Sequence, residues 1–217
     1  IRMSALSPGI DLNDLGFLRR GDLKQWSAEA KGFHLQPWGP FLRWDFRVET
    51  EIDWNYDNTR LRTSSDMSFW GDTPSGGRFH VHMGREFESM DDSDVRRDGP
   101  IIKRLGELWV HSILESDLGR TVSLRVRPGF RRTDGGDAWS RDVSVQFEYR
   151  PLPSVWLSMR PEYETGRRDA QWIDRIEDPI DGNASPHFVY GELRSRILDL
   201  STRARVSFNP ELSVELF

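Results

Sequence analysis

Two histidines and a cluster of carboxylates are the residues of this chain whose types and spacing could do chemistry. His80 and His82 are two residues apart in a predicted strand, so both imidazoles project from the same face. Two histidines with this spacing can bind a single metal ion. No third ligand is evident in the sequence. The alternative is that both are ordinary polar residues of a strand face, and we expect no metal and no other cofactor.

A group of acidic residues near Trp172 is the second candidate for chemistry. Asp174 and Asp178, with Glu177 and Asp181 beside them, would supply the paired carboxylates with which glycoside hydrolases cleave a glycosidic bond. The segment 166–186 reads as irregular, so the sequence does not set the distance between the two carboxylates. Asp174 and Asp178 are therefore candidate catalytic residues, with a surface loop held by aspartate and proline turns as the alternative.

Other catalytic motifs are missing from the sequence. The chain has no cysteine, which excludes disulfides, thiolate metal sites and cysteine nucleophiles. It also lacks the Gly-x-Ser-x-Gly motif of serine hydrolases and a glycine-rich phosphate loop. Gly76-Gly77 and Gly135-Gly136 are instead predicted turn glycines that accept a positive φ. The sequence thus gives little support for an enzyme within this segment.

Charged residues alternate with apolar ones along several segments and form the third feature. Residues two apart in a strand share a face, so these side chains are predicted to form one charged face on which opposite charges of neighbouring strands pair. The residues expected to line a barrel lumen in this way are Arg43, Asp45, Arg47, Glu49, Glu51, Arg125, Arg127, Glu148, Arg203 and Arg205. Such a lining could conduct or bind polar solutes such as sugars, and a plugged structural interior is the alternative.

The elements that must position these residues are strands, because the two-residue alternation runs through most of the chain. The predicted strands are 23–34, 42–56, 60–70, 78–88, 103–116, 121–132, 139–150, 155–165, a long strand from 187 to 208 and a last one after 209–211. Several exceed the usual strand length of globular proteins, as tilted membrane strands do. The predicted fold is all-β: an antiparallel meander of about ten strands that forms part of an outer-membrane-type β-barrel.

The connections and the tryptophans support this fold. Short turns near Asp72, Asp117, Pro151 and Pro210 would lie at one rim, and the long segments 89–100 and 166–186 at the other, as in outer-membrane barrels. Tryptophans at strand ends could form interfacial girdles, namely Trp44, Trp54, Trp70, Trp139 and Trp156. We expect outer-membrane lipid as the partner of the apolar face. A soluble β-sandwich, in which a second sheet covers that face, is the alternative.

The composition excludes several classes of protein. The chain has 217 residues, and 30% of them are charged, but the charges are interleaved and do not form runs. We therefore exclude a disordered chain and a basic patch for nucleic acid. No apolar stretch reaches the roughly 20 residues of a membrane helix. The segment starts at Ile1 and ends within a predicted strand, so residues 1–217 are expected to be one domain, a partial barrel with further strands outside it.

Five motifs in order along the chain carry a resemblance to a known family. They are 13–20 (NDLGFLRR), Ser116-Asp117 with Val122-Ser123-Leu124, 171–174 (QWID) leading to 177–179 (EDP), 188–193 (FVYGEL) and 208–216 (FNPELSVEL). Together they resemble the uncharacterised C-terminal region of bacterial surface proteins whose N-terminal part is similar to family 9 carbohydrate-binding modules. The resemblance implies a C-terminal barrel-like region in the bacterial outer membrane, preceded by a sugar-binding-like β-sandwich, and transfers no catalytic residue.

Three functions remain open from the sequence. The first is a non-enzymatic outer-membrane barrel that displays a carbohydrate-binding domain and passes or binds a polar solute, with a polysaccharide or oligosaccharide as ligand. The second is a surface hydrolase acting on glycans, with catalysis in the acidic segment or in another part of the protein. The third is a soluble β-sandwich that binds carbohydrate.

Overall fold

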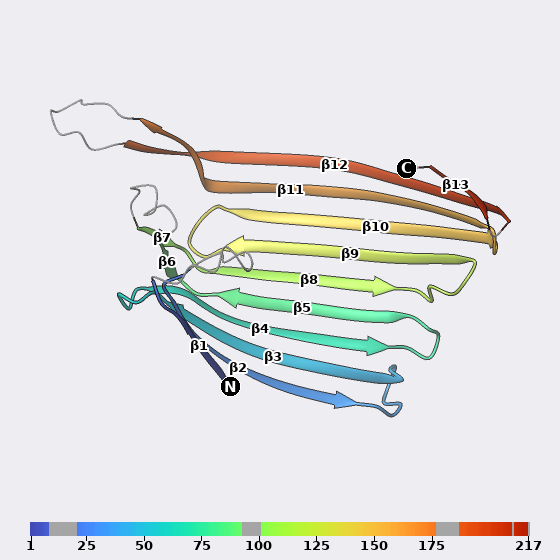
Figure 1. Cartoon of the computed structure of the whole chain (residues 1–217), viewed down its shortest axis with the longest axis horizontal. Helices are drawn as coiled ribbons and strands as arrows, with labels where there is room; N and C mark the ends of the chain where they lie inside the picture. The colour runs from blue at the N-terminus through green and yellow to red at the C-terminus, as the bar shows by residue number, and fades with distance from the viewer. Residues whose placement is uncertain (9–20, 93–100, 177–186, 210, 217) are drawn as a thin grey trace.

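The structure, a computed structural model, describes residues 1–8, 21–92, 101–176, 187–209 and 211–216. These residues form an eleven-stranded antiparallel sheet and a separate two-stranded sheet (Figure 1). Strands of the large sheet follow one another in chain order, and β1 and β13 are its edges. The strands are β1 (Arg2–Leu6), β2 (Leu23–His34), β3 (Arg43–Trp54), β4 (Arg60–Asp72), β5 (Arg78–Glu86), β6 (Ser89–Asp91), β7 (Ile102–Arg104), β8 (Glu107–Glu115), β9 (Val122–Thr133), β10 (Trp139–Leu152), β11 (Val155–Ile176), β12 (His187–Asn209) and β13 (Leu212–Leu216).

The described residues are thus all-β and antiparallel, as the alternation predicts. No helix in these parts of the chain is long and apolar enough to cross a membrane.

The strand β11 is longer than the sequence pattern predicts. β11 runs on to Ile176, through residues 166–176 of the segment that the sequence predicts as irregular, and it pairs with β12 along this length. The pairing register shifts between Arg168 and Gln171 and again between Trp172 and Asp174. Such bulges break the two-residue alternation beyond Arg168, and residues 166–168 (GRR) before them include no apolar residue, so the sequence pattern ends the strand too early. β1 was also missed, in a segment that reads as a loop.

The pairing register assigns each side chain to one of two faces. Arg43 on β3 pairs with Asp72 on β4, Asp72 with Arg78 on β5, Arg78 with Glu115 on β8, and Glu115 with Arg125 on β9. Paired residues of neighbouring strands project to the same side, so this row defines what we name the charged face. Along each strand, the residues that alternate with those of the charged face project to the other side, which we name the apolar face.

Burial in this sheet is the reverse of that in a soluble protein. Among the described residues no hydrophobic side chain is buried, whereas Asp53, Asn55 and four serines are buried. The serines, Ser64, Ser68, Ser123 and Ser144, belong to the charged face, where longer charged side chains surround them. On the apolar face, by contrast, Leu198 and Leu200 are 77% and 62% exposed. The apolar face therefore has no protein cover within the described residues.

The hairpins divide between the two ends of the strands (Figure 1). Residues 35–42, 73–77, 116–121 and 153–154 connect strands at one end, which we name the short-turn rim because most of these connections are short, and β12 ends and β13 begins at the same end. Residues 55–59 and 134–138 connect them at the other, the long-loop rim, where β6 and β7 follow β5 and where β11 ends and β12 begins. Gly76 has a φ of 82° in the turn before β5, and Gly135 has a φ of 63° in the turn before β10, as predicted for turn glycines.

Candidate functional site

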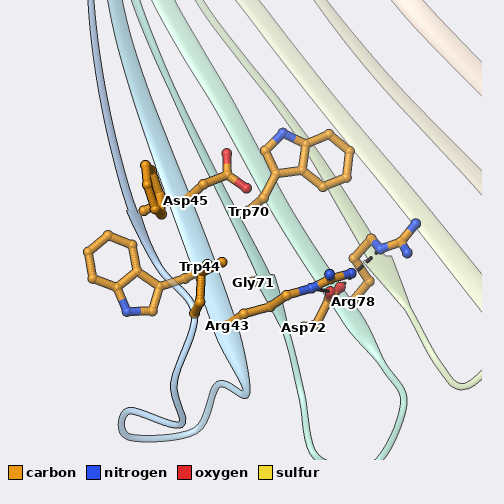
Figure 2. A pocket seen from close by; sticks show the side chains of 9 residues that line it. Arg43, Trp44, Asp45, Trp70, Gly71, Asp72 and Arg78 are labelled. Carbon is orange, nitrogen blue, oxygen red and sulfur yellow. Dashed lines mark hydrogen bonds and ion pairs between the residues drawn. The ribbon is translucent and has the colours of Figure 1, made fainter.

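A row of ion pairs crosses the charged face near the short-turn rim. Asp72 pairs with Arg43 and, at 3.2 Å, with Arg78, whose guanidinium also lies 3.7 Å from Glu115. Glu115 in turn pairs with Arg125, and its side chain is only 8% exposed. Figure 2 shows the first part of this row, with Arg43 and Arg78 reaching Asp72 from opposite sides. Asp72, Arg78 and Glu115 thus each lie between two partners of opposite charge on neighbouring strands, because the register places opposite signs side by side.

The same row continues toward the other edge of the sheet. Arg125 donates to Gln146 Oε1 at 3.4 Å, and Gln146 donates to Glu148 at 2.8 Å. Glu148 also accepts from Trp156 Nε1 at 3.3 Å. Arg205 lies 5.7 Å from the Trp156 ring and pairs with Glu215 on β13. Polar contacts therefore follow the charged face from β3 to β13.

A second set of ion pairs lies closer to the long-loop rim. Arg62 on β4 lies 3.1 Å from Glu51 on β3 and 3.2 Å from Glu86 on β5. Arg131 on β9 lies 2.9 Å from Glu107 on β8. These pairs join neighbouring strands in the same way as the first row. Both rows are positioned by period-two alternation in strands whose partners carry the opposite charge.

A group of aromatic and imidazole rings lies on the charged face between the two rows. The Trp70 and His80 rings stack with centroids 3.7 Å apart, and His80 is 6.1 Å from His82. His82 meets the Trp109 ring edge-on at 4.5 Å, and its Nε2 lies 3.0 Å from Asp66 Oδ1. The register explains this group, since Trp70 pairs with His80 across β4 and β5.

Two adjoining hollows lie beside this ring group, one of about 320 Å³ and the other of about 380 Å³. Both are lined by Phe33, Asp45 and Trp70, which are neighbours in one register row. Figure 2 shows the Asp45 carboxylate beside the edge of the Trp70 ring. An aromatic ring with a carboxylate at its edge suits a ligand with both an apolar face and hydroxyl groups.

Two of the predicted girdle tryptophans lie on the wrong face for that role. Trp70 stacks on His80, and Trp156 donates to Glu148, so both belong to the charged face. The prediction is wrong for these two residues. Trp44, in contrast, lies on the apolar face near the short-turn rim, within 6.0 to 6.2 Å of the Trp38, Phe46 and Phe69 rings.

The ten residues predicted to line a lumen share the charged face. Arg43, Asp45, Arg47, Glu49 and Glu51 alternate along β3, and Arg125 and Arg127 along β9. Glu148 pairs through Ser158 with Arg203, and Arg205 follows on the same side of β12. The structure therefore brings them onto one surface, while their role as a lumen lining stays a prediction.

The structure does not bring the candidate metal ligands or the candidate catalytic carboxylates together into a defined site within the described residues. In the described parts of the chain no group of three or more histidine, cysteine, aspartate or glutamate residues is arranged to hold a metal ion. His82 contacts Asp66, and His80 contacts Trp70. Asp174 is exposed on β11, where it accepts from the backbone N–H of Arg175, and Asp178 lies outside the described residues. The separation of the two carboxylates is therefore not defined.

Comparison with known proteins adds a family. The whole chain, residues 1–217, matches the family described as a domain of unknown function (DUF5916). The chain belongs to this family. Membership agrees with the resemblance of the five motifs to an uncharacterised family, and it leaves the sugar-binding-like domain and the barrel as proposals. No curated protein and no solved structure matches the chain.

Proposed function

We propose that this chain is part of an outer-membrane β-barrel of a bacterial cell-surface protein. Its apolar face lies against lipid, and its charged face lines the interior. The observation that carries the proposal is the inverted burial: in the described residues the buried side chains are polar, and the apolar face has no protein cover. In lipid an exposed apolar face is favourable, whereas in water it is a liability for association.

Strand length and connections support the same arrangement. β2, β3, β4, β9 and β10 have 12 to 14 residues, more than the roughly 9 to 11 that a tilted strand needs to cross a bilayer. The short-turn rim would face the periplasm and the long-loop rim the exterior. The edges β1 and β13 are not paired with each other in the described residues, so closure would come from further strands or from oligomerisation.

The interior would serve polar solutes. Rows of paired arginines and carboxylates keep this face polar without a large net charge, and the hollows beside Trp70 offer a surface to a ligand such as an oligosaccharide. The resemblance described above adds a displayed carbohydrate-binding-like domain. We therefore propose a non-enzymatic role in binding or passing a polar solute at the cell surface.

Cell fractionation of the full-length protein tests this proposal. The membrane fraction is run on electrophoresis with and without boiling, because folded outer-membrane barrels migrate differently from their unfolded chains. We expect recovery in the outer membrane with a heat-dependent shift. Recovery as a soluble protein without a shift would overturn the barrel and favour a soluble carbohydrate-binding or glycan-hydrolysing protein.

A further inference from the structure

A group of arginines breaks the apolar face at one place. Arg132 is the second-last residue of β9 and Arg141 the third residue of β10, so both lie at the long-loop rim beside the hairpin 134–138. Arg141 pairs with Thr165 on β11, and Thr165 pairs with Arg196 on β12. Arg132 pairs with Trp139, two residues before Arg141, so the three arginines lie on the same face of β9, β10 and β12. We name them the arginine patch.

The arginine patch lacks the partners that other arginines of the molecule have. Arg167, on the same face, lies 3.0 to 3.2 Å from Asp137, Asp169 and Glu192. Arg132, Arg141 and Arg196 are exposed, and none of them has a carboxylate partner among the described residues. The planar guanidinium of arginine usually binds an anionic group in a bidentate manner. Three guanidiniums without a carboxylate partner on an apolar face therefore call for an anionic partner from outside the described residues.

Two aromatic rings help to orient the arginine patch. The Arg141 guanidinium lies 5.3 Å from the centroid of Trp139 and 5.9 Å from that of Phe130. Trp139 is also the register partner of Arg132. An aromatic ring beside a cation is typical of the headgroup level of a membrane protein, where apolar and charged groups of the bilayer meet. The same guanidiniums would be costly near the bilayer midplane.

We propose that the arginine patch binds the phosphate groups of anionic lipid headgroups in the leaflet on the long-loop side. This inference rests on the proposed function, because only an inserted sheet presents its apolar face to lipid. Headgroup phosphates offer the oxygens that arginine binds in a bidentate manner. Each arginine near an anionic membrane surface is expected to contribute roughly a fivefold preference for that lipid.

The test compares two bilayers. The full-length protein is folded into vesicles of phosphatidylcholine alone and into vesicles of phosphatidylcholine and phosphatidylglycerol in equal parts. Insertion is checked by the heat-dependent electrophoretic shift. Lipid preference is then measured as the ratio of phosphatidylglycerol to phosphatidylcholine retained on the detergent-extracted protein in native mass spectrometry. The triple variant R132Q/R141Q/R196Q removes the arginine patch.

A matched control removes the same charge from the other face. The control triple variant R62Q/R127Q/R131Q changes arginines on the charged face, two of which pair with Glu51, Glu86 or Glu107. We expect the wild type and the control to prefer phosphatidylglycerol, and the patch variant to lose this preference on the order of a hundredfold. The triple variant R132K/R141K/R196K keeps the positive charges but not the planar guanidiniums, so it should lose only part of the preference for phosphatidylglycerol.

Three results would overturn the inference. One is an unchanged lipid preference in the patch variant, and another is an equal loss in the control. The third is a wild type that inserts into phosphatidylcholine but shows no preference, which would leave the proposed barrel intact. Inorganic phosphate is added as a competitor: if millimolar phosphate displaced the lipid, the arginine patch would be a site for free anions. A protein that inserts into neither bilayer would overturn the proposed function itself.

Discussion

On the charged face, Arg125 lies between Glu115 and Gln146, whereas seven residues later on the same strand Arg132 projects from the apolar face without a carboxylate partner in the described residues. The protein therefore supplies a carboxylate partner to Arg125 on the charged face, whereas it supplies none to Arg132 on the apolar face within the described residues. Serines buried beneath charged side chains and leucines exposed to the outside follow the same division. This difference between the charged face and the apolar face supports the proposal that the sheet separates a polar interior from lipid.

Charge placed on the apolar face should have the largest effect. Val145 lies near the middle of β10 on this face, so Val145→Arg is expected to lower the free energy of unfolding by about 2 to 4 kcal/mol in lipid vesicles. Tyr149→Arg, closer to the short-turn rim, should cost about 1 kcal/mol or less, because the penalty falls toward the bilayer surface. Urea titration of the folded full-length protein measures both.

The neighbouring residue on the other face is the control for this series. Gln146 contacts Arg125 and Glu148, so a guanidinium in Gln146→Arg can pair with Glu148. We expect a change well below that of Val145→Arg. Equal costs at Val145 and Gln146 would contradict the assignment of the two faces.

Loss of a charge in the row of ion pairs near the short-turn rim should have an intermediate effect. Glu115 is almost buried and pairs with Arg78 and Arg125, so Glu115→Gln leaves Arg125 without its carboxylate partner and Arg78 with Asp72 alone. We expect a loss of about 2 kcal/mol in the free energy of unfolding, measured by the same titration. Glu88→Gln is the control, because Glu88 and Lys103 are each 56% exposed and such pairs contribute little. A Glu88→Gln effect as large as that of Glu115→Gln would show that burial in the row does not matter.

Packing of the ring group should have the smallest effect. A Cβ at Gly84 would lie 2.5 Å from Trp109 Cζ2 and 2.8 Å from Asp66 Cβ, so Gly84→Ala must displace the Trp109 ring. We expect a loss of about 1 kcal/mol together with a change in tryptophan fluorescence. In Gly119→Ala only a carboxylate oxygen of Asp117, at 3.2 Å, is close, so this control should leave both quantities nearly unchanged. Wild-type fluorescence in Gly84→Ala would contradict the observed contact with Trp109.

The sequence predicts much of this sheet because one physical rule, alternation with a period of two, governs most of it. The rule identifies β2 with its observed bounds, and it places Arg43, Asp45 and Arg47 on one side of β3. It fails where the ladder is irregular, as in β11 after Arg168, because a bulge moves the following residues out of phase.

The ring group could not be predicted from the sequence. Phe69 and Trp70 are adjacent aromatic residues, so alternation alone does not tell which of them belongs to the charged face. Only the register, in which Trp70 pairs with His80 and Asp45, decides it. The hollows beside Trp70 depend on this contact between strands. Trp156, next to Leu157, was misplaced for the same reason.

A spin-label scan of residues 143–148 on β10 tests the separation of the two faces most directly. Single cysteines carrying a nitroxide are placed at each position of the full-length protein in vesicles, and collision rates with oxygen and with a water-soluble nickel chelate are measured. We predict high oxygen and low nickel accessibility at Val143, Val145 and Phe147, and the opposite order at Ser144, Gln146 and Glu148. Protection of the first three from both reagents would indicate a covering second sheet and contradict contact with lipid.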